Sequence, residues 1–227
     1  MPKITCNFTR FCLLLIRLET FGSYKVIPPF NMPKNERLIR QFGTLILASS
    51  SPRRAQLLEQ IGFDFKIVPS RVEETFDHAD PATVARTLAE QKAEDVAVKF
   101  EDQWVLVADT VVALNGRLLG KPKDPSDASE MLHFLSGQTH EVMTGFSFIH
   151  LQKKIRFTDY ERTWVTFRKL SEREITEYID TGSAADKAGA YGIQDMSAVF
   201  VEKIDGDFYN VVGLPITKIY TRLHQLI

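Results

Sequence analysis

Cysteine is nearly absent from this chain of 227 residues: Cys6 and Cys12 are its two cysteines, and both lie in the first dozen positions. The rest of the sequence therefore has neither a disulfide bond nor a metal site built on thiolates. A chain without disulfides fits a reducing intracellular compartment. We accordingly expect a cytoplasmic protein.

Long apolar runs and an excess of charge of one sign are also missing. No stretch of 18 or more apolar residues occurs, so the sequence predicts no membrane span and no membrane partner. The 28 basic residues nearly balance the 29 acidic ones, which argues against nucleic-acid binding by bulk electrostatics. With 44% hydrophobic and 25% charged residues, the composition is that of a globular protein and excludes a disordered chain.

The first forty residues differ from the rest. Prolines at positions 28, 29 and 33 interrupt any regular element there. The apolar run 11–16 is shorter than the core of a secretory signal, and the match to a mitochondrial presequence is partial. We predict that residues 1–40 form a poorly ordered extension, with mitochondrial targeting as the alternative. Residues 41–227 are then one domain.

Strand and helix patterns alternate from residue 44 onward. We expect strands at 44–48, 63–68, 104–108, 111–114, 141–151 and 155–167. We expect helices at 52–61, 81–100, 124–135, 171–180 and 215–226, with Ser171 and Glu174 as a capping box at the start of the fourth. Asn115-Gly116 predicts a hairpin, and Asp205-Gly206 predicts another between strands at 198–204 and 208–212. Hairpins among alternating strands and helices predict an α/β fold with a mixed sheet.

The segment Ser49-Ser50-Ser51-Pro52-Arg53-Arg54 joins the first strand to the first helix. Ser51 is the predicted N-cap and Pro52 the first helical residue. A helix N-terminus offers free N–H groups to a phosphate, and hydroxyls and guanidinium groups add further donors. The glycine-rich Walker loop is absent, so an anion site and a capped helix with solvated arginines are equally open alternatives.

Several charged residues follow predicted strands or lie on helices. Asp109 ends an apolar run, where a carboxylate is poorly tolerated unless it is used or paired. It is a candidate general base or metal ligand, or simply a turn cap. Lys92 and Lys121 are candidate phosphate partners, although each alone is typical of a solvated lysine. Glu73 and Glu74 point to opposite sides of an extended segment, so at most one enters a shared site.

The segment 186–194 is rich in small residues, and its two glycines permit close approach of the backbone to a ligand. Gln194 offers both a donor and an acceptor to a base edge, and Lys187 adds a cation. An ordered loop before a strand is the alternative. Cations for phosphate together with carboxylates for Mg²⁺ are typical of phosphoryl chemistry. The pattern predicts a nucleotide-handling enzyme without specifying the bond that it cleaves.

Six motifs occur in order: LASSSPRR (47–54), ADTVV (108–112), GKP (120–122), LSGQTHEVMTG (135–145), DKAGAYGIQ (186–194) and NVVGLP (210–215). From about residue 44 to the C-terminus, the chain resembles the Maf family of nucleotide pyrophosphatases. The resemblance implies an elongated, twisted mixed sheet with flanking helices and a central cleft between two lobes.

The resemblance also implies an activity, which is hydrolysis of nucleoside triphosphates to the monophosphate and pyrophosphate with Mg²⁺ or Mn²⁺. The motif KAGAYGIQ is similar to the branch that acts on dTTP and UTP. Roles in nucleotide-pool sanitation and cell-division arrest, and a homodimer, are further implications. The alternatives are a pyrophosphatase for 7-methyl-GTP or other modified nucleotides, and a nucleotide-binding division regulator without turnover.

Carried over by motif, the general base of the family falls on Asp109. The specificity positions of the family fall on Arg53, Thr110 and Gln194, and its charged cleft residues on Glu73 or Glu74, Lys92 and Lys121. Ser51 and Arg54 are further candidates for binding the triphosphate, by their chemistry alone. The candidate metal ligands, by the chemistry of their carboxylates, are Glu73, Glu74 and Asp109. One departure is Asp195, because a glycine usually follows the glutamine in the family; this leaves fine specificity open.

Overall fold

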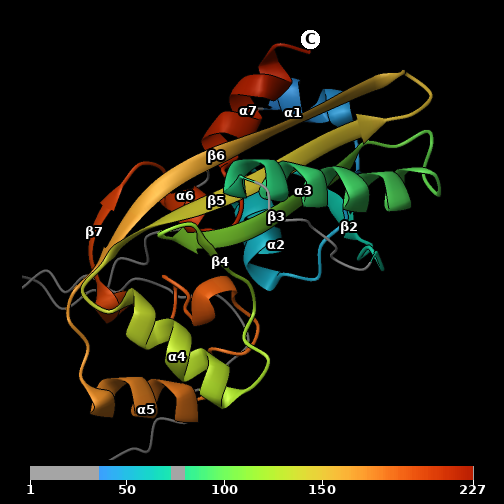
Figure 1. Ribbon diagram of the computed structural model, residues 1–227. Helices are drawn as coiled ribbons and strands as arrows, with labels where there is room; N and C mark the ends of the chain where they lie inside the picture. The colour runs from blue at the N-terminus through green and yellow to red at the C-terminus, as the bar shows by residue number, and fades with distance from the viewer. Residues whose placement is uncertain (1–35, 73–79, 227) are drawn as a thin grey trace, which may run out of the picture. The chain divides into compact units, whose positions relative to one another are not determined.

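The computed structural model describes residues 36–72 and 80–226 (Figure 1). The chain divides into two units, 1–36 and 37–227, and the fold described below is that of the second. Its first helix, α1 (Glu36–Phe42), places Ile39 and Phe42 in the core. Ile39, which precedes the predicted boundary at residue 41, therefore belongs to this core. None of the helices in the described part is both long and apolar enough to cross a bilayer.

Seven strands of the described residues form one mixed sheet. They are β1 (Leu45–Leu47), β2 (Phe65–Ile67), β3 (Val105–Leu114), β4 (Arg117–Leu119), β5 (Thr139–His150), β6 (Ile155–Phe167) and β7 (Val201–Asp205). Their order is β2-β1-β3-β5-β6-β7, with β4 paired to β3. β1 is parallel to β2 and β3, and the other pairs are antiparallel. The predicted α/β fold with a mixed sheet is confirmed.

Helices cover the sheet and gather at one end of it. The longer ones are α2 (Pro52–Gln60), α3 (Pro81–Ala97), α4 (Pro125–Leu135), α5 (Glu172–Asp180) and α7 (Ile216–His224). Three short ones are η1 (Ala188–Ala190), η2 (Met196–Phe200) and α6 (Phe208–Val212). α3 packs on one face of the central strands, while α1, α2, α6 and α7 pack on the other. α4 and α5 form a separate core with η1 and η2 (Figure 1).

Strand β3 contributes to the cores on both faces because successive side chains of a strand alternate. Val107 and Val111 pack with residues of α3. Leu106 and Ala108 join the core that includes α2, α6 and α7. Asp109 therefore faces α3, and the next residue, Thr110, faces the opposite side of the sheet.

One edge of β3 is left uncovered in the middle of the strand. β1 pairs with β3 only at Val105 and Leu106, whereas β4 pairs with residues 112–114. Among the described residues, no strand covers the intervening edge of β3, which includes Asp109 and Thr110. The sheet is thus split where β1 ends and α2 begins.

Helix α3 lies unusually close to the sheet at Gly145, the residue of β5 that pairs with Asp109. A Cβ atom added to Gly145 would stand 2.1 Å from the carbonyl oxygen of Ala85. A side chain of any size is therefore excluded at this crossing. Lys92 follows Ala85 by about two helical turns and lies on the same side of α3, so the close crossing brings its side chain toward Asp109.

Most of the turns and helix caps that local sequence patterns predict occur in the structure. Asn115 and Gly116 have φ values of 51° and 78° and connect β3 to β4, which confirms the first predicted hairpin. Ser171 and Glu174 form the predicted capping box of α5. Ser51 is the N-cap residue of α2, although its side chain makes no capping hydrogen bond.

The second predicted hairpin is wrong. Residues 208–212 form helix α6, and residues 198–200 belong to η2. The side chain of Asp207 accepts a hydrogen bond from the Tyr209 N–H (2.7 Å) and caps the helix, while Gly213 ends it with a φ of 113°. β7 pairs with β6 instead.

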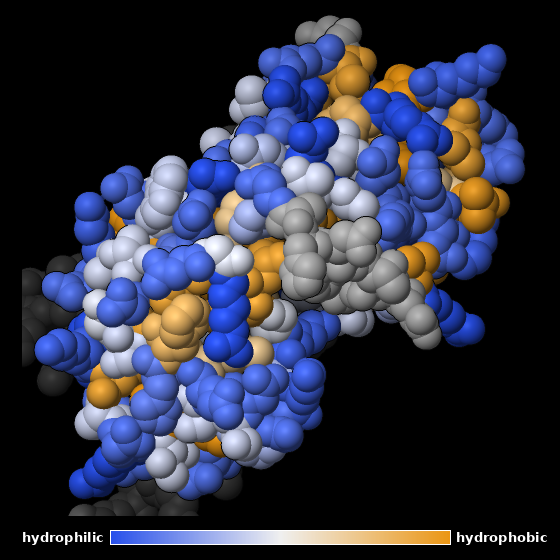
Figure 2. Space-filling view, in the orientation of Figure 1, coloured by the Kyte–Doolittle hydropathy of each residue, from blue (hydrophilic) through white to orange (hydrophobic). Residues whose placement is uncertain are grey.

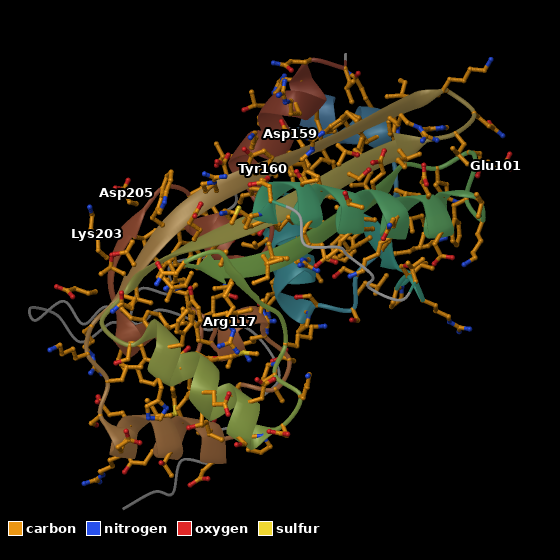
Figure 3. All side chains as sticks on the ribbon, viewed as in Figure 1. Glu101, Arg117, Asp159, Tyr160, Lys203 and Asp205 are labelled. Atoms are coloured by element: carbon orange, nitrogen blue, oxygen red, sulfur yellow. The ribbon has the colours of Figure 1, made fainter. Side chains whose placement is uncertain are left out.

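Charged side chains occupy the side of the sheet formed by β6 and β7 (Figure 3). Asp159 of β6 accepts a hydrogen bond from Arg222 of α7 (2.8 Å). Lys203 and Asp205 of β7 form an exposed ion pair of 3.5 Å. Charges of this kind disfavour pairing with another strand.

We predict that Gly145→Ala lowers the free energy of unfolding by about 3 kcal/mol, because the added methyl group overlaps a backbone carbonyl that cannot rotate away. Urea unfolding measures the change. The matched control is Gly120→Ala, since an added Cβ at Gly120 has no atom within 4 Å. The control should be neutral or stabilising by up to about 1 kcal/mol. Equal stability of the two variants would contradict the close crossing of α3.

Candidate active site

A cleft of about 490 Å³ opens at the uncovered edge of β3. It is bordered on one side by the turn between β1 and α2 and on the other by β4, the following turn and the segment 186–194. The predicted residues that line it are Ser51, Arg53, Arg54, Lys92, Asp109, Thr110, Lys121 and Gln194. Folding thus brings together motifs that lie up to 143 positions apart in the sequence. Hydrophilic residues also cover most of the face shown in Figure 2, without one dominant apolar patch.

Asp109 forms an ion pair with Lys92 of α3 inside this cleft. The side chains of Asp109 and Lys92 are only 11% and 16% exposed. Removing a carboxylate from water costs several kcal/mol unless a partner compensates it. The pair therefore explains how the strand tolerates a charge at this position.

The two neighbouring arginines, Arg53 and Arg54, form hydrogen bonds with different parts of the protein. Arg53 donates to the carboxylate of Asp186 (3.1 Å), which lies across the cleft at the start of the glycine-rich segment. Arg54 donates to the Gly213 carbonyl (2.8 Å), the Ser49 hydroxyl (2.9 Å) and the Thr110 hydroxyl (3.1 Å). Its guanidinium group thus joins the end of β1, the middle of β3 and the end of α6.

A buried chain of hydrogen bonds continues from Thr110. Its hydroxyl lies 2.9 Å from that of Thr144, and Thr144 donates to the carbonyl of Asn210 (3.0 Å). Because Thr144 has only one hydroxyl proton, Thr110 must be the donor to Thr144 and the acceptor from Arg54. The hydroxyl of Thr110 is therefore already engaged on both sides. Asn210 completes the chain by donating to Val142 O (3.0 Å).

Two predicted residues have polar groups that are open to the cleft. Lys121, in the turn after β4, and Gln194 are both exposed. Neither makes a side-chain hydrogen bond or ion pair with the residues that the structure describes. Their ammonium and amide groups are accordingly able to bind a ligand. Ser51, which is half buried at the start of α2, adds a hydroxyl group.

Lys187 lines the cleft, and its ammonium group is held by residues of its own part of the chain. Its ammonium group donates to the Ser183 carbonyl, to Asp186 (2.7 Å) and to Asp195 (3.3 Å). Burial opposes ionisation of Asp186, but hydrogen bonds and charges from Lys187 and Arg53 outweigh it and hold the pKa of Asp186 below its ordinary value. Lys187 thus acts within the segment.

The predicted metal ligands Glu73 and Glu74 lie outside the described residues. Within the described residues, no three His, Cys, Asp or Glu side chains come together as a metal site. The described carboxylates of the cleft are Asp109 and Asp186, and each is paired with a cation.

Sequence reasoning missed three polar residues beneath the cleft. Thr144 and Asn210 lie inside motifs that were recognised as a whole, but nothing singled them out. His140 is 1% exposed and its Nε2 lies 2.7 Å from the hydroxyl of Tyr191, a cleft residue. A polar residue inside an apolar strand pattern is the feature that marks such positions.

The chain matches the family model described as "Maf-like protein" over residues 44–226, and it belongs to this family. It is 51% identical over 181 residues to a Bacillus cytotoxicus protein named dTTP/UTP pyrophosphatase, covering 79% of this chain and 94% of the relative. A Bacillus cereus protein of the same name is 50% identical over 182 residues, covering 80% of this chain and 94% of the relative.

Likeness to solved structures is lower. The Staphylococcus aureus Ham1 protein has a TM-score of 0.39 and 17% identity, covering 55% of this chain and 71% of that protein. Membership of the Maf-like family rests on the sequence matches alone.

We predict that His140 makes the protein less stable in acid. Burial lowers the pKa of His140 from 6.5 to about 4. As the pH falls from 6.5 to about 4, the unfolded chain takes up a proton that the folded chain refuses, so stability falls. The loss over this range should be about 3 kcal/mol.

Urea unfolding across this pH range measures the effect, with His140→Gln as the variant that cannot titrate. The unfolding free energy of the variant should fall less steeply with acid than that of the wild type. Parallel profiles for the two proteins would show that His140 is not held neutral in the fold.

Proposed function

We propose that this protein hydrolyses nucleoside triphosphates, with dTTP and UTP as its substrates, to the monophosphate and pyrophosphate. The observation that carries the proposal is the buried Asp109–Lys92 pair in a cleft that also presents Arg53 and Lys121. A carboxylate surrounded by cations suits a reaction of water with a polyphosphate. The names and identities of the Bacillus relatives support the same substrates.

The triphosphate binds along the cations of the cleft. Phosphate oxygens accept charge-assisted hydrogen bonds from Arg53, Lys92 and Lys121, and from the Ser51 hydroxyl. Arg53 then exchanges Asp186 for phosphate. Arg54 contributes indirectly, because its guanidinium group hydrogen-bonds to residues at the end of β1, in β3 and at the end of α6 and so holds these elements together around the cleft.

Asp109 is the general base of the proposed reaction. As phosphate oxygens engage Lys92, a carboxylate oxygen of Asp109 takes a proton from a water molecule. The water oxygen bonds to the α-phosphorus, and the bond from this phosphorus to the bridging oxygen breaks. Pyrophosphate leaves with the electron pair of that bond, and the proton remains on Asp109.

A divalent cation fits the donor chemistry of this site. Mg²⁺ and Mn²⁺ prefer carboxylate oxygens, and Mg²⁺ is usually held by one or two carboxylates together with substrate phosphates. Asp109 would supply one ligand, and either Glu73 or Glu74 would supply another. The ion would neutralise charge on the phosphates when bound.

The nucleobase end of the cleft contains Gln194. Its amide group offers a donor and an acceptor, which match the O4 acceptor and the N3–H donor of thymine and uracil. Thr110 influences specificity through its bonds to Arg54 and Thr144, since its hydroxyl is already engaged. A cytoplasmic location, a homodimer and a role in removing non-standard nucleotides remain expectations from the family resemblance.

The test of the proposed function is a kinetic panel that measures pyrophosphate release with Mg²⁺ or Mn²⁺. We expect dTTP and UTP to give the highest kcat/KM. Faster turnover of 7-methyl-GTP or another modified nucleotide would replace the substrate and keep the reaction. Nucleotide binding without pyrophosphate release would instead favour a non-catalytic regulator.

We predict that Asp109→Asn lowers kcat by about 10²- to 10⁴-fold, because the amide cannot accept the proton of the attacking water. The matched control is Asp186→Asn, the same change at another carboxylate of the cleft, which should keep most of its kcat. Melting temperatures show whether both variants are folded. Near wild-type turnover of Asp109→Asn would exclude its role as the base.

A further inference from the structure

Four alternating charges connect the two ends of the cleft. Arg53, in the first turn of α2, bonds Asp186 (3.1 Å). Lys187 bonds the other oxygen of Asp186 (2.7 Å) and Oδ2 of Asp195 (3.3 Å). We call Arg53, Asp186, Lys187 and Asp195 the ion chain. It runs from the phosphate end of the cleft to the residue that follows Gln194.

Asp195 is the most fully bonded member of the ion chain. Its Oδ1 atom accepts from the backbone N–H of Ser197 (2.9 Å), so that Asp195 caps η2. The same oxygen lies 2.7 Å from the Ser197 hydroxyl, which is also 2.9 Å from the Gly192 carbonyl. Its Oδ2 atom accepts from the hydroxyl of Tyr178 (3.3 Å) as well as from Lys187. Ser197 and Tyr178 are only 0% and 2% exposed. The carboxylate therefore ties its backbone to a rigid, buried support.

Asp195 acts from outside the cleft. Gln194 lines the cleft, whereas Asp195 does not. The backbone of Gly192 packs so closely on Lys187 that an added Cβ would stand 2.6 Å from the lysine side chain. The segment that carries Gln194 is thus held by Lys187, which also lines the cleft, and by Asp195, which does not.

We propose that Asp195 is a positioning residue that sets nucleobase affinity by holding Gln194 in place. The inference rests on the proposed function, and it assigns a role to the residue that departs from the family pattern. Asparagine at position 195 keeps one oxygen for Ser197, but its NH₂ group can neither accept from Tyr178 nor pair with Lys187. The support of the backbone at Gln194 is then weakened. Asp109 and its partner Lys92 lie outside the ion chain.

The experiment compares Asp195→Asn with the wild type on two substrates, dTTP and an abasic deoxyribose triphosphate that presents no base to Gln194. We expect KM for dTTP to rise about tenfold, because a tenfold loss of affinity corresponds to the loss of about one hydrogen bond. The kcat for dTTP and the KM for the abasic substrate should stay close to wild type. The matched control is Asp205→Asn, an exposed ion-paired aspartate on β7, which should change neither constant.

Dependence on Gln194 is the sharper test. In a Gln194→Ala background, Asp195→Asn should raise KM no further, because both changes remove the same contact. Additive effects would overturn the proposal. So would a fall in kcat alone, or an equal rise in KM for the abasic substrate, since either result would point to a merely structural role.

A second variant and the activity of the wild type separate failure of this proposal from failure to fold and from failure of the proposed function. If Asp195→Asn does not fold, Tyr178→Phe decides the matter, because it removes one donor to the same carboxylate and should raise KM for dTTP more modestly. An unchanged KM in folded Tyr178→Phe would then contradict the proposal. If the wild type releases no pyrophosphate from dTTP, the proposed function itself fails, and not this inference alone.

Discussion

The whole site depends on the middle of strand β3, where the strand has no neighbour on one edge among the described residues. Alternation of side chains along this strand sends Asp109 to the face of α3 and Thr110 to the opposite face. Each face then provides its own support, Lys92 for the carboxylate and Arg54 for the hydroxyl. The split lies at the end of a parallel strand, where ligands commonly bind in open α/β sheets.

The hydrogen-bond chain that starts at Arg54 pairs the hydroxyl groups of Thr110 on β3 and Thr144 on β5. The chain from Arg54 through Thr110 and Thr144 to Asn210 leaves each of its hydroxyl groups with a donor and an acceptor. Such a network favours one arrangement of the strands, because a lost partner leaves a desolvated group unpaired. The close crossing of α3 at Gly145 adds a steric constraint of the same kind.

Local chemistry made much of the fold predictable. Asn115-Gly116 and the Ser171–Glu174 capping box act over a few residues, and both occur as predicted. Asp205-Gly206 misled because the adjacent Asp207 caps a helix, and pairing of β7 with β6 decided the outcome. That choice is made by distant partners, which short patterns do not contain.

The sequence predicted which residues form the candidate site, but it did not predict which of them contact one another. The motifs located Asp109 and Gln194, yet the sequence could not show that Arg54 bonds protein oxygens or that Lys187 bonds Asp195. Those contacts span up to 159 positions, and only the fold brings them together. From the sequence, Asp195 was only a departure from the family pattern. Its four hydrogen-bonding contacts in the fold are the basis for the positioning role that we propose.

The central claim is that the cleft directs water to the α-phosphorus of a nucleoside triphosphate. Hydrolysis of dTTP in ¹⁸O-labelled water, followed by mass spectrometry of both products, tests this directly. We expect the label in the nucleoside monophosphate and none in the pyrophosphate. Label in the pyrophosphate, or release of single phosphates, would contradict it.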